Sequence, residues 1–220
     1  MPKKKKGNLQ SVKPVFKMFC EGEKTEPLYI RGYINHFHSD KRSIIVVENT
    51  NKNTPVQLVE VAITAKNQGS GNDVVWVVFD RESEAKYSHE LHAQARAKAL
   101  ANGIQIAFSN VCFEFWILLH FGYIAGSYSS YDDLKKRSAL IPKLKEVGIQ
   151  NYDKASPILF DRVKELIPEA IKNSERLKIQ AVKASDSGKT APHHLNPYVD
   201  VHEMFLDMKN FIDGKKSVRE

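Results

Sequence analysis

Acidic side chains follow two of the most apolar short segments of the chain. They are Glu21, Glu23, Glu26, Asp80 and Glu82. If these segments are parallel strands, their carboxyl ends meet at one edge of the sheet, where ligands bind in open α/β folds. Carboxylates that converge there repel one another unless a cation lies among them, and oxygen ligands suit Mg²⁺ or Mn²⁺ rather than zinc. The spacing therefore predicts a site for one or two Mg²⁺ or Mn²⁺ ions.

A structural role is the alternative for each acid, because carboxylates near a helix N-terminus interact favourably with its dipole and its unpaired N–H groups. This explanation is the simpler one for Glu26 or Glu84 taken alone. Asp80 and Glu82 form an acid-x-acid pair at the end of the most apolar segment, where a single carboxylate would suffice for a cap. We therefore interpret that pair as metal-binding.

Glu114 lies within an apolar segment, 113–121, that predicts a buried helix. An ionised buried carboxylate is costly unless it is paired or bound to a cation, so either a role at the site or a buried salt bridge must explain it. The same segment contains His120 and Trp116, which we interpret as core residues. Asn110 precedes it, in the loop after another predicted strand.

The elements that would position these residues alternate between strand and helix. Apolar, β-branched or aromatic runs predict strands at 15–20, 43–47, 74–79 and 104–108, and helical periodicity or composition predicts helices at 25–37, 54–67, 83–102 and 113–121. Such alternation implies right-handed crossovers and a parallel sheet. The sequence thus predicts an α/β domain over 13–125.

The rest of the chain, 126–220, predicts a helical extension packed on that domain. Helices are expected at 131–147, at 157–182 with a bend or break at Pro168, and in a last amphipathic segment ending near Ile212. No strand is expected beyond Gly126. A polar loop at 183–196 contains Lys189, His193 and His194, which are either solvated or available to phosphate.

The positive charge of the chain is concentrated at its start. Net charge is +7, and six lysines with no acid lie within residues 1–17, so the remainder has 27 basic and 26 acidic residues. Residues 1–12 are predicted to form a flexible basic tail. Such a tail is either a solvated leader or an arm that adds salt-sensitive affinity for nucleic acid.

Several classes of protein are disfavoured by composition. No apolar run reaches the roughly 18–20 residues of a membrane span, and no apolar segment of a secretion signal follows the lysines. Cys20 and Cys112 lie far apart in sequence, without His or Cys at ligand spacing. We therefore expect a reduced, cytoplasmic chain without a zinc site.

Four segments together resemble the RloB-like family, and the resemblance extends over nearly the whole chain. They are CEGEKTEP at 20–27, FDRE at 79–82, SNVCFEFWILLHF at 109–121 and NPY at 196–198. The family is regarded as Toprim-like nucleases that accompany bacterial defence and abortive-infection loci. The resemblance thus implies a Toprim-like (Rossmannoid) parallel sheet flanked by helices.

The resemblance also implies roles for individual residues. Glu21 matches the Toprim glutamate, and Asp80 and Glu82 match the acidic pair that holds divalent metal. Glu26, or Glu23 in its place, would be the additional acid of OLD-type nucleases. In the hypothesis that follows, Glu26 or Glu114 completes a second metal site or serves as the base.

The resulting hypothesis is a metal-dependent nuclease that acts on DNA or RNA, tRNA included, as an anti-phage effector. The expected catalytic residues are Glu21, Asp80, Glu82 and Glu26, the expected metal ligands are Glu21, Asp80, Glu82 and Glu114, and the expected substrate contacts are Lys24, Arg81, Asn110, Lys189 and His194. The resemblance further implies an ATPase partner encoded nearby. Two alternatives remain: a non-catalytic module that binds nucleic acid or a partner, and a phosphatase with Asp80 as nucleophile, for which no downstream lysine-plus-acid set is evident.

Overall fold

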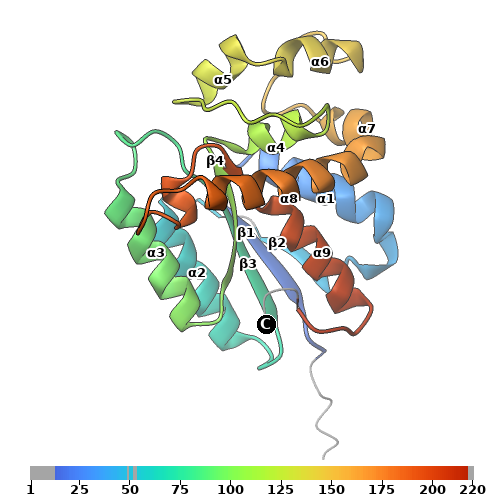
Figure 1. Cartoon of the computed structure of the whole chain (residues 1–220). Helices are drawn as coiled ribbons and strands as arrows, with labels where there is room; N and C mark the ends of the chain where they lie inside the picture. Colours follow the sequence, from blue (N-terminus) through green and yellow to red (C-terminus); the bar gives the residue numbers. More distant parts are fainter. Residues whose placement is uncertain (1–12, 49, 52–53, 218–220) are drawn as a thin grey trace, which may run out of the picture.

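A five-stranded, mostly parallel sheet forms the centre of the molecule (Figure 1). The computed structural model describes residues 13–48, 50–51 and 54–217, and the predicted basic tail at 1–12 lies outside them. The strands are β1 (Phe16–Cys20), β2 (Ile45–Glu48), β3 (Val74–Asp80), β4 (Gln105–Asn110) and β5 (Tyr198–Val199). Their order is β2-β1-β3-β4-β5, with only β5 antiparallel to its neighbour. The predicted α/β class is confirmed.

The strand β5 is a correction to the sequence prediction, which placed no strand after Gly126. Ser109 and Asn110 of β4 pair with Val199 and Tyr198. The carboxylate Oδ1 of Asp200 also accepts a hydrogen bond from the backbone N–H of Phe108 at 2.7 Å. Two residues are too few to show strand periodicity, so the sequence gives no signal for β5.

Helices cover both faces of the sheet. Those of the predicted α/β domain are α1 (Thr25–Phe37), α2 (Pro55–Gln68), α3 (His89–Ala101) and α4 (Phe113–Leu119). Those of the extension are α5 (Tyr131–Arg137), α6 (Leu140–Glu146), α7 (Leu159–Val163), α8 (Ile167–Lys183) and α9 (Val201–Ile212). Short 3₁₀ turns are η1 (Ser39–Lys41), η2 (Lys164–Leu166) and η3 (Pro192–His194).

Two helix starts show how local sequence sets the boundaries. The Thr54 hydroxyl accepts a hydrogen bond from the N–H of Gln57 and so caps the start of α2, close to the start of the helix predicted at 54–67. The helix expected from residue 83 instead begins at His89, where Ser88 provides the cap. The preceding residues form a turn in which the N–H groups of Lys86 and Tyr87 donate to the Ser83 carbonyl, and the Arg81 guanidinium donates to the carbonyl of Tyr87 at 2.6 Å.

The break predicted near Pro168 is also present. α7 and η2 end before α8, and Pro168 occupies the first turn of α8, where a missing N–H has no helical partner to lose. The helix expected over 131–147 is interrupted between α5 and α6. No helix among the described residues is both long and apolar enough to cross a membrane.

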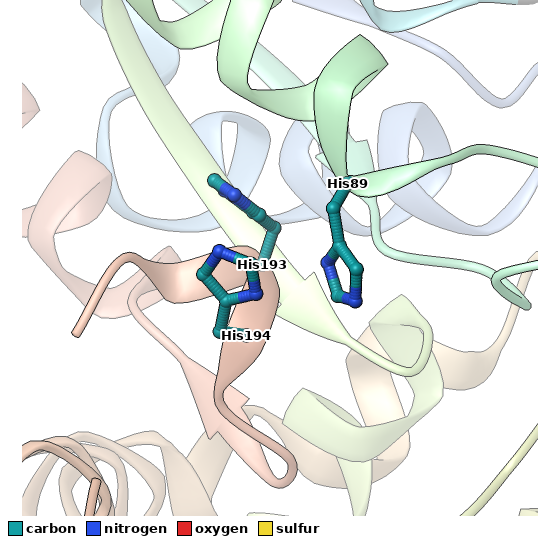
Figure 2. A group of neighbouring side chains, drawn as sticks. All are labelled: His89, His193 and His194. Atoms are coloured by element: carbon teal, nitrogen blue, oxygen red, sulfur yellow. The ribbon is translucent and has the colours of Figure 1, made fainter. Parts of the chain in front are cut away.

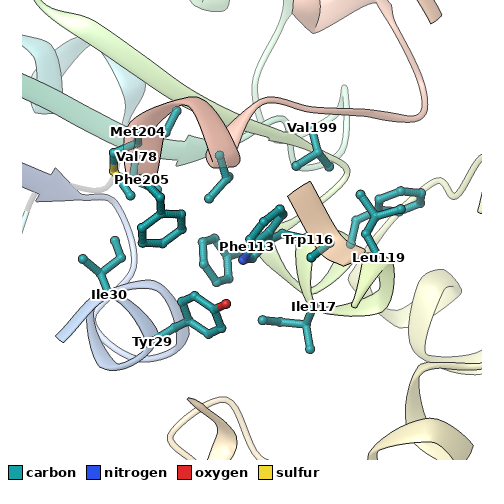
Figure 3. Close-up of a cluster of buried hydrophobic side chains, with 14 of the residues drawn as sticks. Tyr29, Ile30, Val78, Phe113, Trp116, Ile117, Leu119, Val199, Met204 and Phe205 are labelled. Atoms are coloured by element: carbon teal, nitrogen blue, oxygen red, sulfur yellow. The ribbon is translucent and has the colours of Figure 1, made fainter. Parts of the chain in front are cut away.

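The larger core lies between the sheet and the helices α1, α4, α8 and α9, and the smaller core lies under α2 and α3. Figure 3 shows aromatic side chains from α1, α4 and α9 in the larger core. Tyr29 donates its hydroxyl toward His120 Nε2 at 2.8 Å, and His120 Nδ1 lies 3.0 Å from the carbonyl of Trp116. His120 and Trp116 are both fully enclosed, which confirms them as core residues.

Candidate metal centre

The ends of β1 and β3 bring Glu21 and Asp80 together, as the sequence predicts. Cys20 is paired with Val78 in the parallel register, and the N–H of Glu21 donates to the Val78 carbonyl at 2.9 Å. The backbone N–H of Asp80 in turn donates to Glu21 Oε2 at 3.3 Å. The two carboxylates are thus held at one edge of the sheet by the strands themselves.

Each of these two carboxylates has one oxygen that is buried without a hydrogen bond. Asp80 is 6% exposed, and its Oδ2 accepts from the N–H of Phe113 at the start of α4 at 3.0 Å. Within the described part of the chain, neither Asp80 Oδ1 nor Glu21 Oε1 has a hydrogen-bond partner. Buried polar atoms are nearly always satisfied in proteins, so these two oxygens are available to a ligand such as a water molecule or a cation.

Glu26 completes the acidic cluster from the first turn of α1. Its carboxylate lies directly over Gly22: a Cβ atom at position 22 would be 2.3 Å from Glu26 Oε2 and 2.8 Å from Oε1. The absence of a side chain at Gly22 is therefore what admits the carboxylate of Glu26 to the site. A glycine directly after Glu21 is therefore needed for the Glu26 carboxylate to lie beside that of Glu21.

Glu82 follows in the loop after β3 and has a left-handed backbone, with φ of 54°. Such a conformation is uncommon for a residue with a side chain and is found at turns and functional sites. The N–H of Glu82 is anchored to the Val111 carbonyl at 3.0 Å. Its carboxylate, about one-third exposed, forms an ion pair with Lys86 at 3.0 Å.

These acids line a pocket with a volume of about 460 Å³. Its walls comprise Glu21, Gly22, Glu23, Lys24, Thr25, Glu26, Asp80, Glu82, Lys86, Tyr87 and Lys154. The structure thus brings all four predicted catalytic acids together, and Lys24 lies beside them. Glu23 lines the rim and is exposed, whereas Glu26 is buried, so Glu26 is the better placed of the two for a role at the metal.

Burial and mutual repulsion shift the carboxyl pKa values upward. Burial raises the pKa of Asp80 well above its usual range, and the charges of Glu26, Glu114 and Glu21 raise it further. Burial likewise raises the pKa of Glu26 to about 7, with Glu114 adding to the rise. The pKa of Glu21 is also raised, again by burial first. A cation in the pocket would offset this repulsion, which is the electrostatic condition of a metal site.

Glu114 lies behind the pocket rather than in its wall. It is 1% exposed, and its Oε1 accepts hydrogen bonds from the hydroxyls of Thr25 and Tyr152, each at 3.1 Å. Its Oε2 is 3.6 Å from the ammonium of Lys154. Of the two explanations left open by the sequence, the ion pair with Lys154 is therefore present.

Lys154 at the pocket and Tyr152 at Glu114 are residues that the sequence did not predict. Both come from the connection between α6 and α7, in the extension, and Lys154 reaches the pocket wall. The Glu114 carboxylate and the neighbouring acids favour the charged form of Lys154 and raise its pKa, although burial opposes this. A lysine in an aperiodic loop 40 residues from its partner gives no spacing signal.

Two residues expected to contact substrate have buried structural partners instead. Arg81 is 4% exposed, points away from the acidic pocket, and donates to the carbonyls of Tyr87 at 2.6 Å and His193 at 3.0 Å. Successive side chains of a strand point to opposite faces, so Arg81 cannot accompany Asp80. Asn110 is also buried and donates to the Leu195 carbonyl at 2.6 Å.

Lys189 and His194, also expected at the substrate, are not brought to the acids. They line a separate pocket of about 440 Å³ together with residues of α8 and of the segment 194–197. Lys189 is exposed and lies 3.7 Å from Asp186. Of the predicted substrate contacts, only Lys24 therefore lies at the acidic pocket.

The family model for RloB-like proteins matches residues 16–207. The chain belongs to the RloB-like family. This match includes the ends of β1 and β3 and also Lys154 of the extension. Comparison with curated proteins and with solved structures gave no match.

Proposed function

We propose that this RloB-like protein is a metal-dependent nuclease that binds one or two Mg²⁺ or Mn²⁺ ions in the acidic pocket. The observation that carries the proposal is the pair of buried, unpartnered oxygens Asp80 Oδ1 and Glu21 Oε1, at the wall of one open pocket in the described structure. Carboxylate oxygens at a strand edge are the ligand type that these hard cations prefer. A Toprim-like assignment of the sheet belongs to the same proposal.

Glu21 and Asp80 would hold the metal, and Glu82 is placed to join them after exchanging its ion pair with Lys86. The metal, when bound, supplies activation of a water nucleophile and stabilisation of the leaving oxygen of a phosphodiester. Glu26 remains buried beside Gly22, and its pKa near 7 suits a group that accepts and returns a proton at neutral pH.

Basic side chains at the same pocket would bind the phosphate. Lys24 and Lys86 are exposed at the rim, and Lys154 projects into the wall from the extension. Lysine ammonium groups bind phosphate as point charges without reading the base sequence. This arrangement supports a phosphodiester substrate in DNA or RNA, including tRNA, rather than a particular sequence.

The biological setting belongs to the proposal as well. Membership of the RloB-like family supports a role as an anti-phage effector in the bacterial cytoplasm, controlled by an ATPase encoded nearby. Such control would explain how a toxic nuclease is kept inactive. It would act through the exposed rim of the pocket or through the extension that supplies Lys154.

Metal binding and cleavage can be tested separately. The tag-free chain is titrated calorimetrically with Mn²⁺ and then incubated with single-stranded DNA, duplex DNA or total tRNA in Mg²⁺ or Mn²⁺, alone and with its genomic neighbour. We expect Mn²⁺ binding that is lost in the double variant Glu21→Gln and Asp80→Asn. The matched control Asp186→Asn changes an exposed acid at the other pocket and should bind as the wild type does.

Three results are informative. Metal binding with cleavage supports the whole proposal, and binding without cleavage of any substrate, even with the neighbour present, leaves a metal-binding module and refutes the nuclease. Mn²⁺ binding that is equal in the wild type and the double variant refutes the assignment of Glu21 and Asp80.

A further inference from the structure

Three histidines gather on the opposite face of the sheet from the acidic pocket. His89 begins α3, and His193 and His194 end η3 (Figure 2). One ring nitrogen of each lies within 4.8 Å of the others. The ring centroid of His194 is 4.4 Å from that of His89 and 4.3 Å from that of His193. The three imidazoles thus lie close together, although they come from two segments a hundred residues apart.

The cluster is held in place by buried contacts around it. Arg81 Nε donates to the His193 carbonyl at 3.0 Å, and its Nη1 donates to the Tyr87 carbonyl at 2.6 Å. Arg81 therefore ties η3 to the turn that leads into α3. His193 stacks on His92 of α3, with ring centroids 6.1 Å apart and planes within 14°. This framework positions the imidazoles before any ligand binds.

His193 has a buried ring nitrogen that is available to a ligand. It is 4% exposed, and its Nδ1 is buried without a hydrogen-bond partner among the residues that the structure describes. Burial and the neighbouring His194 lower the pKa of His193 to about 4, and burial also lowers that of His194.

Charge near the cluster is mixed. The Arg81 Nη2 atom is 3.4 Å from His89 Nδ1, and Arg96 and Lys189 also act on the cluster, so these cations oppose the binding of a metal ion. The carboxylate of Glu84 is 3.4 Å from His89 Nε2, and Glu90 is a second acid close to His89 and His193. The Glu84 side chain is largely exposed and free to turn toward the three rings. It is placed to provide an anionic fourth ligand and part of the negative charge that a metal ion beside these cations requires.

We propose that His89, His193 and His194 form a second metal site, for Zn²⁺ or a similar transition-metal ion, with Glu84 as the fourth ligand. Imidazole suits such ions, whereas Mg²⁺ and Mn²⁺ favour oxygen. Zn–N bonds of about 2.0–2.1 Å place tetrahedral ligand atoms roughly 3.4 Å apart, so closing the cluster requires small side-chain movements only. The site clamps η3 to α3 and is independent of the proposed nuclease activity.

The test is metal binding by the tag-free full chain, stripped with a chelator and dialysed. Zn²⁺ is titrated calorimetrically, and Co²⁺ is used as a spectroscopic probe, because its visible absorption reports tetrahedral nitrogen ligation. With excess Mg²⁺ present to occupy the acidic pocket, we expect one equivalent of Zn²⁺ per chain and a Co²⁺ spectrum that Zn²⁺ displaces. The double variant His89→Ala, His194→Ala avoids the buried His193 and should lose both signals, while Glu84→Gln should bind roughly tenfold more weakly.

Two controls make the result specific. His36→Ala removes an exposed histidine of α1 outside the cluster and should leave Zn²⁺ binding unchanged. The variant Asp80→Asn should also retain it, which separates this site from the acidic pocket. Melting in EDTA verifies that the double variant is folded. Absence of Zn²⁺ binding by the wild type, equal binding by the folded double variant, or loss of binding in Asp80→Asn would overturn the proposal.

Discussion

The two faces of the sheet carry different ligand sets at the same edge. Asp80, the last residue of β3, faces the larger core and joins Glu21 and Glu26, whereas Arg81, the next residue, turns to the side of α3 and contacts the loop of His193. One peptide unit therefore separates a pocket of carboxylate oxygens from a cluster of imidazole nitrogens. Successive side chains of a strand point to opposite faces of the sheet, so Asp80 and Arg81, although adjacent in sequence, have different surroundings.

The largest effect is expected when Asp80 is removed and the adjacent Arg81 is kept. Asp80→Ala should reduce metal-dependent cleavage by more than roughly 100-fold, because loss of even an outer partner of a metal costs 10–100-fold. The fold should persist, since Asp80 lies at a strand end and its loss also relieves repulsion. Cleavage assays in Mg²⁺ and Mn²⁺, with circular dichroism of the same samples, measure both effects.

The control for Asp80→Ala is Asp132→Ala, which removes an exposed acid from the first turn of α5. It should retain the activity of the wild type. Full activity of Asp80→Ala with any divalent metal would contradict the assignment of the acidic pocket.

The stability contributed by a buried titratable group should also depend on pH with opposite sign on the two faces of the sheet. The folded-state pKa of Glu26 is raised to about 7, above its ordinary value of 4.5, so the folded protein binds the proton more tightly than the unfolded chain. Between pH 7 and 4.5, the wild type should gain stability relative to Glu26→Gln as the pH falls, by on the order of 2 kcal/mol. Urea unfolding of both proteins at several pH values measures the difference.

His92, on the α3 face, provides the comparison of opposite sign. Burial lowers its pKa to about 3, so the stability that it contributes is present above pH 6.5 and is lost as the pH falls toward 3. For Glu26, the contrary result is a free energy of unfolding that changes with pH equally in the wild type and in Glu26→Gln. It would show that Glu26 titrates normally in the folded state.

Glu114→Gln tests whether the carboxylate behind the pocket stabilises the metal-free protein through its ion pair with Lys154 or destabilises it until a metal binds. The change removes the charge facing Lys154 but keeps an acceptor for the hydroxyls of Thr25 and Tyr152. Because the lysine is partly exposed, the loss in EDTA should be about 1–2 kcal/mol, below the cost of stranding a fully buried charge.

Thermal melting of the wild type and of Glu114→Gln, in EDTA and in Mn²⁺, measures this loss of stability. Glu146→Gln is the matched control, because it removes an exposed partner of Lys143 and should change stability by less than about 0.5 kcal/mol. Unchanged or increased stability of Glu114→Gln in EDTA would mean that repulsion from Asp80 and Glu26 outweighs the ion pair.

The smallest effect is expected at the start of the chain. Deleting residues 2–12, which are outside the described structure, should shift the melting temperature by no more than roughly 1 °C, because no apolar pattern in this segment predicts a packed element. If the lysines form an arm for nucleic acid, the deletion should flatten the salt dependence of binding. Filter binding over a range of salt concentrations measures the slope, and an identical slope would identify a solvated leader.

The acidic pocket was predictable because its residues follow strands whose apolar runs are unmistakable. β1 and β3 place Glu21 and Asp80 together through ordinary parallel pairing, so only the strand assignment was needed. Arg81 was wrongly expected there because neighbours in sequence were taken as neighbours in space. Strand alternation alone would have corrected that expectation.

Other features had no local signal. Lys154 approaches Glu114 from an aperiodic loop, and β5 is too short for its period to be seen. The three histidines join positions 89 and 193–194, whose approach depends on how the extension returns to the sheet. Contacts of this kind require knowledge of the tertiary fold.

The extension contributes β5 to the sheet and α8 and α9 to the larger core, and this limits where the chain can be truncated. The boundary after residue 125 follows the change from alternating strands to helices, yet β5 closes the sheet beyond it and α8 and α9 share one core with β1. Trp76 of β3 donates its indole N–H to Asp207 of α9 at 2.9 Å. A recombinant fragment ending at 125 would therefore present the apolar face of its own sheet to solvent and would lack Lys154. The α/β region and its extension share one sheet and one core, so we expect them to fold only together.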